Sequence, residues 1–297
     1  MNPWIEAARP RTLPLALSCI LMGCFLAAAS GTFSWPVALL SVLTTIILQV
    51  LSNFVNDYGD AVNGKDTALR QGPKRAVHSG EISSSSMLKA IVVFAALALI
   101  SGVLLLTIAL RNAPANAFWV FLGIGIACII AAITYTAGKR PYGYVGLGDL
   151  SVLIFFGWVG VLGSSYLHTH IWDWGLLLPA SSCGLFAVGV LNINNIRDIE
   201  SDKATGKNSI PVRLGREKAV RYHWAILITG MLCVLIYTIL HFSHYTSLIF
   251  LFSFPLFIKN GLAISRLTKA SELDPYLKQM ALSTLLFVIL FGIGIVL

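Results

Sequence analysis

Carboxylate and amide side chains crowd the end of a long apolar run between residues 53 and 66. If a helix continues through this stretch, Asn53, Asp57 and Asp60 are spaced i, i+4 and i+7. At that spacing they share an arc of about 60° on one helix face. A single Asp at the centre of a membrane helix costs on the order of 3 kcal/mol. Several Asp on one face therefore predict a polar cavity, a bound cation, or both.

A second stretch of the same kind follows another apolar run, between residues 192 and 207. Here Asn194, Asp198 and Asp202 are spaced i, i+4 and i+8, and Asn195 joins the two aspartates within an arc of about 100°. Either motif alone is compatible with an acidic face exposed to solvent. The matched pair favours a shared ligand, because carboxylate and amide oxygens suit Mg²⁺ that is partly held by substrate phosphates.

Basic residues lie in the loops beside both motifs, where they complete the chemistry of a diphosphate site. Aspartates alone would repel a diphosphate. Mg²⁺ between them makes the approach attractive, and Lys and Arg neutralise the remaining phosphate oxygens. A diphosphate held in this way is a good leaving group, and the rest of its molecule can extend into lipid.

The composition predicts an integral membrane protein. The 297 residues are 57% hydrophobic and only 11% charged, with a mean hydropathy of +0.80, whereas a soluble domain carries about 25% charged residues. The net charge of +8 does not indicate nucleic-acid binding, because the basic residues lie between apolar runs and form no continuous patch. The five cysteines lie inside apolar runs without metal-ligand spacing, which favours a packing role.

Nine apolar segments are long enough to cross a membrane, so the predicted fold is an all-α bundle of nine transmembrane helices. All Lys and Arg except Arg111 fall on the side of the N-terminus and of the connections after even-numbered segments. The positive-inside rule places that side, with both acidic motifs, in the cytoplasm. The predicted spans cover residues 13–30, 35–56, 88–110, 116–136, 150–167, 174–196, 224–241, 246–265 and 280–297.

The two motifs lie four spans apart, which predicts a repeat within a single domain of residues 1–297. The repeated units would cover about residues 1–136 and 140–265 in the same orientation, with an extra helix over about 280–297. A secondary transporter is an alternative, since transporters also contain repeats and membrane carboxylates. Their coupling residues, however, typically lie near the bilayer midplane on broken helices, often within inverted repeats. Carboxylates at one face and a parallel repeat favour an enzyme.

The two acidic motifs resemble those of the UbiA superfamily of intramembrane prenyltransferases, and the resemblance covers nearly the whole chain. The first motif is similar to the family's Asn-Asp-x-x-Asp at Asn56, Asp57 and Asp60. The second is similar to its Asp-x-x-x-Asp at Asp198 and Asp202. The resemblance implies a UbiA-type helical bundle.

One departure from the commonest family pattern points to a branch of the superfamily. A further Asp usually follows four residues after the second, where this chain has Gly64; the third carboxylate is instead Asp66. This longer spacing is similar to the branch that makes menaquinone precursors. So are the segments at residues 8–14, 206–207 and 212–215.

The resemblance also implies roles for individual residues. Two Mg²⁺ ions are expected, one at Asn53, Asn56, Asp57, Asp60 and Asp66 and the other at Asn195, Asp198 and Asp202. Of these ligands, the residues expected to be catalytic are Asp57, Asp60, Asp198 and Asp202. Diphosphate contacts are expected from Lys65, Arg70, Lys74, Arg75, Lys139, Arg140 and Lys207. Candidates to face an allylic carbocation on the isoprenoid, or to serve as interfacial anchors, are Tyr135, Tyr142 and Tyr144.

The reaction implied by this branch joins a polyprenyl diphosphate to 1,4-dihydroxy-2-naphthoate. The acceptor ring attacks the carbocation and loses its carboxyl group as CO₂, which is a step of menaquinone biosynthesis. The implied location is the bacterial inner membrane, with the active site at the cytoplasmic face. A different aromatic acceptor, such as 4-hydroxybenzoate or homogentisate, is the alternative within the superfamily.

Overall fold

The structure is a computed structural model that describes residues 2–66, 72 and 75–297. Within those residues nine helical segments are long and apolar enough to cross a membrane, as the sequence predicts, and no β-strand occurs. The elements are α1 (Pro3–Ala8), α2 (Leu13–Ala29), α3 (Trp35–Val62), α4 (Ser84–Ala109), α5 (Ala115–Thr134), α6 (Gly148–Val152), the π-helical segment η3 (Leu153–Leu162), α7 (Gly163–Thr169), α8 (Leu177–Arg197), α9 (Ile199–Ala204), α10 (Ile210–Leu214), α11 (Arg216–Leu240), the 3₁₀ segment η5 (Tyr245–Ser253), α12 (Phe254–Arg266) and α13 (Asp274–Val296).

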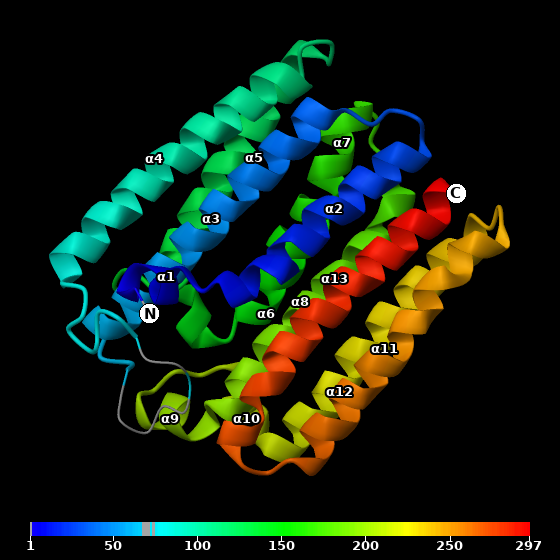
Figure 1. Cartoon of the computed structure of the whole chain (residues 1–297). Helices are drawn as coiled ribbons and strands as arrows, with labels where there is room; N and C mark the ends of the chain where they lie inside the picture. The colour runs from blue at the N-terminus through cyan, green and yellow to red at the C-terminus, as the bar shows by residue number, and fades with distance from the viewer. Residues whose placement is uncertain (1, 67–71, 73–74) are drawn as a thin grey trace.

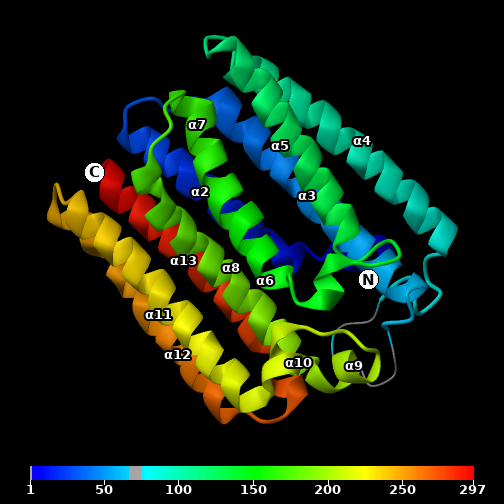
Figure 2. The same cartoon turned by 180° about the vertical axis from the view of Figure 1, so that it is seen from behind.

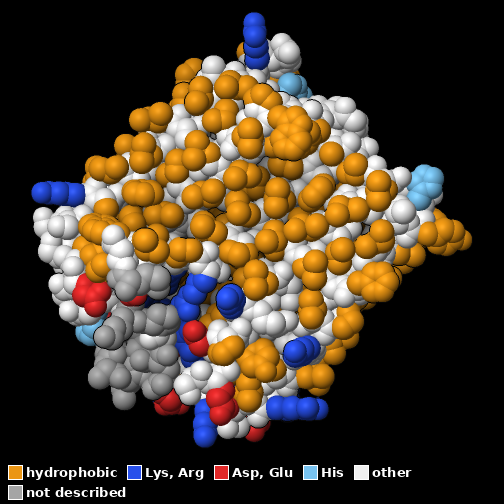
Figure 3. Space-filling view, viewed as in Figure 1, with side chains coloured by type: hydrophobic (Ala, Val, Ile, Leu, Met, Phe, Trp, Pro, Cys, Tyr) orange, Lys and Arg blue, Asp and Glu red, His pale blue; other side chains and the backbone are white. Residues whose placement is uncertain are grey.

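The long helices form one bundle, in which α2, α8 and α13 separate two flanks. Figures 1 and 2 show α3, α4 and α5 on one flank and α11 and α12 on the other. The N-terminus and the ends of α3, α5, α8 and α12 lie at the same end of the bundle as α9 and α10. We call this the motif end, because it contains both acidic motifs. Figure 3 shows hydrophobic side chains over the middle of one face, with charged side chains gathered mainly at the motif end.

The first motif continues its helix, whereas the second interrupts one. Helix α3 runs through Asn53, Asp57 and Asp60 to Val62, as the i, i+4, i+7 spacing predicts. Helix α8 ends at Arg197, and Asp198 lies at the joint before the short helix α9. The predicted continuous face of the second motif is therefore bent at Asp198.

Several helices begin earlier than hydropathy alone predicts. Helix α11 begins at Arg216 and α13 at Asp274, because their polar first turns are helical although they are not apolar. Helix α4 begins at Ser84, and the Ser83 hydroxyl caps it by accepting the Ser86 N–H at 3.2 Å.

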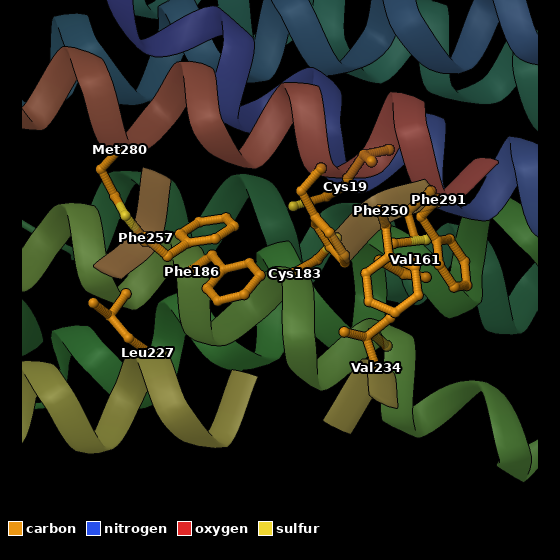
Figure 4. Packing of buried hydrophobic residues seen from close by; sticks show 14 of the residues in the cluster. Cys19, Val161, Cys183, Phe186, Leu227, Val234, Phe250, Phe257, Met280 and Phe291 are labelled. Carbon is orange, nitrogen blue, oxygen red and sulfur yellow. The ribbon is translucent and has the colours of Figure 1, made fainter. Parts of the chain in front are cut away.

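The part of the bundle made of α8, α11, η5, α12 and α13, which we call the filled region, is packed with aromatic rings. Five phenylalanines on these elements are fully buried, and Phe186 stacks on Phe257 with ring centroids 4.0 Å apart (Figure 4). Apolar helices in lipid gain no hydrophobic driving force by associating, so close van der Waals packing of this kind holds them together. The five are Phe186, Phe250, Phe257, Phe287 and Phe291.

The opposite part of the bundle, which we call the hollow region, consists of α2 to α7 with η3 and contains a partly open cavity of about 620 Å³. The lining is mostly apolar. It extends from Asn56 and Tyr142 at the motif end to Leu167 and Trp172 near the other end. The cavity therefore joins the first acidic motif to the apolar interior of the bundle.

Candidate active site

Asp60 is the buried centre of the first motif, and two side chains from other loops converge on it. The Tyr144 hydroxyl donates to its Oδ1 at 2.7 Å, and Arg75 Nη2 donates to its Oδ2 at 2.5 Å. Arg75 Nε also lies 3.6 Å from Asp66 Oδ1, and all three charged side chains are buried. Arg75 therefore draws together the two carboxylates predicted as ligands, including the displaced one at Asp66.

Asp57 holds the loop that carries Arg75. Its Oδ2 accepts the Ala76 N–H and its Oδ1 accepts the Val77 N–H, both at 3.0 Å. These two bonds fix the backbone next to Arg75 against α3. Asp57 thus has a defined role in building the site, while its predicted contact with a metal stays a prediction.

Asp202 brings the second motif to the same place. Its carboxylate lies 3.5 Å from both Lys207 Nζ and the Ser209 hydroxyl. Burial raises the pKa of Asp202 to about 6, Lys207 opposes that rise, and the charges of Asp198 and Asp60 add to it. Tyr144 joins the two motifs, because its hydroxyl donates to Asp60 at 2.7 Å and its ring centroid lies 5.9 Å from Lys207 Nζ, the ion-pair partner of Asp202.

Asp198 is oriented by a buried arginine. Arg197 donates to both carboxylate oxygens of Asp198, from Nε at 2.9 Å and from Nη2 at 2.7 Å. Its Nη1 donates to Asp274 Oδ1 at 2.6 Å, and the Arg197 side chain is fully buried. The sequence analysis did not find Arg197 and Asp274, because nothing in their local sequence indicates that the start of α13 meets the end of α8.

The loop between α5 and α6 closes the site through Tyr144. Lys65 Nζ lies 5.4 Å and Lys207 Nζ 5.9 Å from the centroid of its ring. The Asn208 N–H donates to the Tyr144 carbonyl at 2.8 Å, and the Lys65 ammonium donates to the Thr205 carbonyl. Burial and the charge of Asp60 raise the pKa of Tyr144, so its hydroxyl stays protonated and donates. Tyr144 thus lies among charged groups.

Tyr135 and Tyr142 line the cavity where it meets this polar site. Their rings are 5.3 Å apart and nearly perpendicular. The Tyr142 hydroxyl donates to the Ala131 carbonyl at 2.9 Å and lies 2.9 Å from the Ser151 hydroxyl. Burial raises the pKa of both tyrosines, so they remain neutral. Their position suits the predicted contact with an isoprenoid, which stays a prediction.

The remaining predicted residues occupy varied places. Asn53 and Asn56 line the cavity, and Asn195 is buried at the end of α8. Lys139 and Arg140 are exposed and make no hydrogen bond or ion pair among the residues that the structure describes. The predictions for Arg70 and Lys74 concern positions outside the described residues.

Two residues that the sequence analysis missed bring α3 and the loop after α5 together. The Thr136 hydroxyl lies 3.0 Å from the Val55 carbonyl and 3.1 Å from Asn56 Oδ1. A Cβ on Gly59 would lie 2.6 Å from the Thr136 carbonyl oxygen, so only glycine permits this approach. The glycine inside the first motif was the available signal.

The site fits Mg²⁺ that is completed by a phosphate ligand. In the described part of the chain, no group of three or more His, Cys, Asp or Glu is placed to hold a metal by itself. Mg²⁺ usually keeps several waters and binds through one or two carboxylates plus substrate phosphates. Asp60, Asp66 and Asp202 are buried oxygen donors from both motifs, and Arg75 and Lys207 lie beside them.

Comparisons with known proteins agree with this arrangement. The profile of the UbiA prenyltransferase family matches residues 16–288. The chain belongs to the UbiA prenyltransferase family. It is 44% identical to the 1,4-dihydroxy-2-naphthoate octaprenyltransferase of Escherichia coli K12, over 98% of this chain and 94% of that protein. It is 45% identical to the Haemophilus influenzae protein of the same name, over 99% of this chain and 96% of that protein.

Solved structures share the fold. A UbiA homolog from Archaeoglobus fulgidus, bound to GPP and Mg²⁺, superposes with a TM-score of 0.59 at 17% identity. The match covers 97% of this chain and 99% of that one. The nine spans predicted from hydropathy are present in the described residues, and the UbiA-type bundle implied by the two acidic motifs is confirmed.

Proposed function

We propose that this UbiA-family protein transfers a polyprenyl chain from a polyprenyl diphosphate to 1,4-dihydroxy-2-naphthoate, in menaquinone biosynthesis. The names of the two bacterial relatives support this acceptor. The observation that carries the proposal is the position of an apolar cavity of about 620 Å³ beside the buried acidic site: Asn53 and Asn56 line the cavity, and Asp57 and Asp60 follow them on α3. A diphosphate suits the acidic site and a hydrocarbon chain suits the cavity. The C–O bond that joins them in the donor would therefore lie where the site and the cavity adjoin.

Asp60 and Asp66 of the first motif and Asp202 of the second would hold Mg²⁺ only together with the oxygens of the diphosphate, in keeping with the ion bound along with GPP in the A. fulgidus homolog. Bound Mg²⁺ neutralises the diphosphate and makes it a better leaving group. Lys65, Arg75 and Lys207 surround the same space, as their ion pairs and ring contacts with the site show. They donate to phosphate oxygens and stabilise the charge that develops as the C–O bond breaks.

The chain's own residues then protect the carbocation. The apolar wall of the cavity excludes water from the allylic cation, and the π faces of Tyr135 and Tyr142 lie at the junction to stabilise it. The ring carbon that bears the carboxylate forms the new C–C bond with the carbocation. Its bond to the carboxylate then breaks, CO₂ leaves, and the electron pair of that bond restores the aromatic ring. Diphosphate and CO₂ are both released, so the atoms and charges of the reaction balance.

The proposed orientation puts the motif end in the bacterial cytoplasm. The diphosphate group of the donor and the naphthoate acceptor enter the site from there. Every Lys and Arg except Arg111 belongs to the side of the N-terminus, which supports this orientation by the positive-inside rule. The prenyl chain enters from the lipid bilayer.

The test is a panel of aromatic acceptors with purified protein, Mg²⁺ and a polyprenyl diphosphate, with product masses as the readout. We expect a product from 1,4-dihydroxy-2-naphthoate that has gained the prenyl group and lost the mass of CO₂. A product formed only from 4-hydroxybenzoate or homogentisate would replace the acceptor while retaining the reaction class. Absence of diphosphate release with every acceptor would reject prenyl transfer.

A further inference from the structure

The cavity wall contains a pair of amide side chains whose orientation is fixed from behind. Gln49 Nε2 donates to the Thr12 hydroxyl oxygen at 3.0 Å, and Asn53 Nδ2 donates to the same oxygen at 3.1 Å. Asn53 Nδ2 also donates to the Ala8 carbonyl at 2.9 Å. Thr12 in turn donates to the Arg9 carbonyl at 2.9 Å, so the segment before α2 holds both amides by their nitrogens.

This anchoring leaves two carbonyl oxygens for a ligand. Gln49 and Asn53 both line the cavity. The Gln49 Oε1 and the Asn53 Oδ1 accept no hydrogen bond from the described residues, although Asn53 is only 3% exposed. An amide that faces an apolar cavity is costly unless it is paired. A hydrocarbon chain cannot pair it, so the prenyl donor does not explain these residues.

We infer that Gln49 and Asn53 bind the hydroxyl groups of the aromatic acceptor, and that Thr12 positions them for it. The Asn53 oxygen, nearer the diphosphate site, accepts from the 1-hydroxyl of a dihydroxynaphthoate, and the deeper Gln49 oxygen accepts from its 4-hydroxyl. The two residues are one helical turn apart, about 6 Å along α3, which is comparable to the separation of two para hydroxyls on a ring. This inference rests on the proposed function and adds the groups that recognise the acceptor.

The position along α3 agrees with the reaction. Asn53 precedes Asp60 by seven residues, about 10 Å along the helix axis, and Gln49 lies one turn deeper. An acceptor held there lies on the cavity side of the diphosphate, where the carbocation forms. A phenol that donates to a carbonyl oxygen gives a more electron-rich ring, which attacks a cation more readily.

The test pairs a variant with an acceptor that lacks one hydroxyl. We compare kcat/KM for 1,4-dihydroxy-2-naphthoate and 1-hydroxy-2-naphthoate in the wild type and in Gln49→Leu. Removing one partner of such a bond leaves the other unpaired. We therefore expect Gln49→Leu to lower kcat/KM at least about tenfold for the dihydroxy acceptor and only about twofold for the monohydroxy acceptor. The KM for the prenyl diphosphate should stay unchanged.

Thr12 supplies a second, independent pair of variants. Thr12→Val keeps the shape but removes the oxygen that holds both amides, whereas Thr12→Ser keeps that oxygen. We expect Thr12→Val, like Gln49→Leu, to lower the ratio of kcat/KM for the dihydroxy acceptor to kcat/KM for the monohydroxy acceptor. Thr12→Ser should keep the wild-type ratio. This pair also decides the question if Gln49→Leu does not fold.

The outcomes separate the inference from the proposed function. Equal losses for both acceptors, or a raised KM for the prenyl diphosphate, would mean that the amides only anchor α2 to α3, and would overturn the inference. A wild-type ratio of kcat/KM for the two acceptors in both Gln49→Leu and Thr12→Val would also overturn the inference. A wild-type protein that prenylates neither naphthoate would instead reject the proposed function.

Discussion

The filled and hollow regions of this bundle have similarly apolar sequences but opposite interiors. In the filled region, Phe186, Phe257 and Phe287 bury their rings against one another, with centroids 4.0 to 6.3 Å apart. In the hollow region, a Cβ added to Gly102 or Gly125 on the cavity wall would meet no atom within 4 Å. The first region uses its side chains to pack helices, and the second leaves room for a ligand.

This difference indicates separate roles: the filled region stabilises the bundle, and the hollow region provides space for a ligand. Because lipid provides no hydrophobic drive for helix association, stability must come from dense packing, which the filled region supplies. The hollow region can then keep an open volume beside Asp60 at little cost to the whole bundle. Helix α8 links them, since it packs on α11 in the filled region and carries Asp198 to the site.

The largest expected effect is on activity at the motif end. We expect Asp60→Asn or Asp202→Asn to lower kcat at least about 100-fold, because each removes a charge that holds the metal and diphosphate, worth several kcal/mol. Turnover of purified variants with Mg²⁺ and both substrates measures it. Glu200→Gln is the matched control, since Glu200 is an exposed carboxylate on the same short helix as Asp202. Near-normal turnover of Asp202→Asn would remove the second motif from the site.

The next effect is on stability and should appear only in the filled region. We expect Phe186→Ala to lower the free energy of unfolding by about 3–5 kcal/mol, because it leaves a cavity beside Phe257 and Phe287. Unfolding in detergent micelles measures this change. Turnover per folded molecule should stay within about twofold of wild type. For Phe155→Ala, a half-buried ring beside an existing cavity, the loss of stability should be at most about half of that for Phe186→Ala, because fewer packing contacts are removed. Equal destabilisation by both variants would abolish the distinction between the regions.

The smallest expected effect comes from a matched pair of glycine substitutions. Gly125→Leu places a side chain in the open cavity, so it should leave stability nearly unchanged while lowering kcat/KM for a long-chain donor about tenfold. Gly230→Leu places its Cβ 2.7 Å from the ring of Phe186, so it should cost about 1–3 kcal/mol of stability through overpacking. Thermal unfolding and steady-state kinetics on both variants check the pair. A fully active Gly125→Leu enzyme would show that the prenyl chain does not use this cavity.

The sequence predicted the helices that carry this site better than the side-chain contacts within it. Nine spans, the helical continuation through Asp60 and the pairing of two acidic motifs follow from hydropathy and from local spacing, which are properties of neighbouring residues. The contact between Arg197 and Asp274 joins residues 77 positions apart, and no local pattern encodes it. The parallel repeat stays a prediction.

The two regions themselves could not be predicted from the sequence. Phe186 and Phe155 both lie in apolar spans, and a membrane helix is apolar on faces that meet lipid, protein or a cavity alike. The amphipathic pattern that reveals the core of a soluble helix is therefore missing. Tyr144 shows the same difficulty at the loop, because its sequence suits either a cation-facing ring or the Asp60 partner that it proves to be.

The most direct test of prenyl transfer to a carboxylated naphthol is the fate of the acceptor's carboxyl carbon. Purified protein receives Mg²⁺, a polyprenyl diphosphate and dihydroxynaphthoate labelled at the carboxyl group, and CO₂, diphosphate and prenylated product are counted together. We expect labelled CO₂, diphosphate and prenylated product to appear in equal amounts. Diphosphate release without labelled CO₂, or a prenylated product that retains the label, would contradict it.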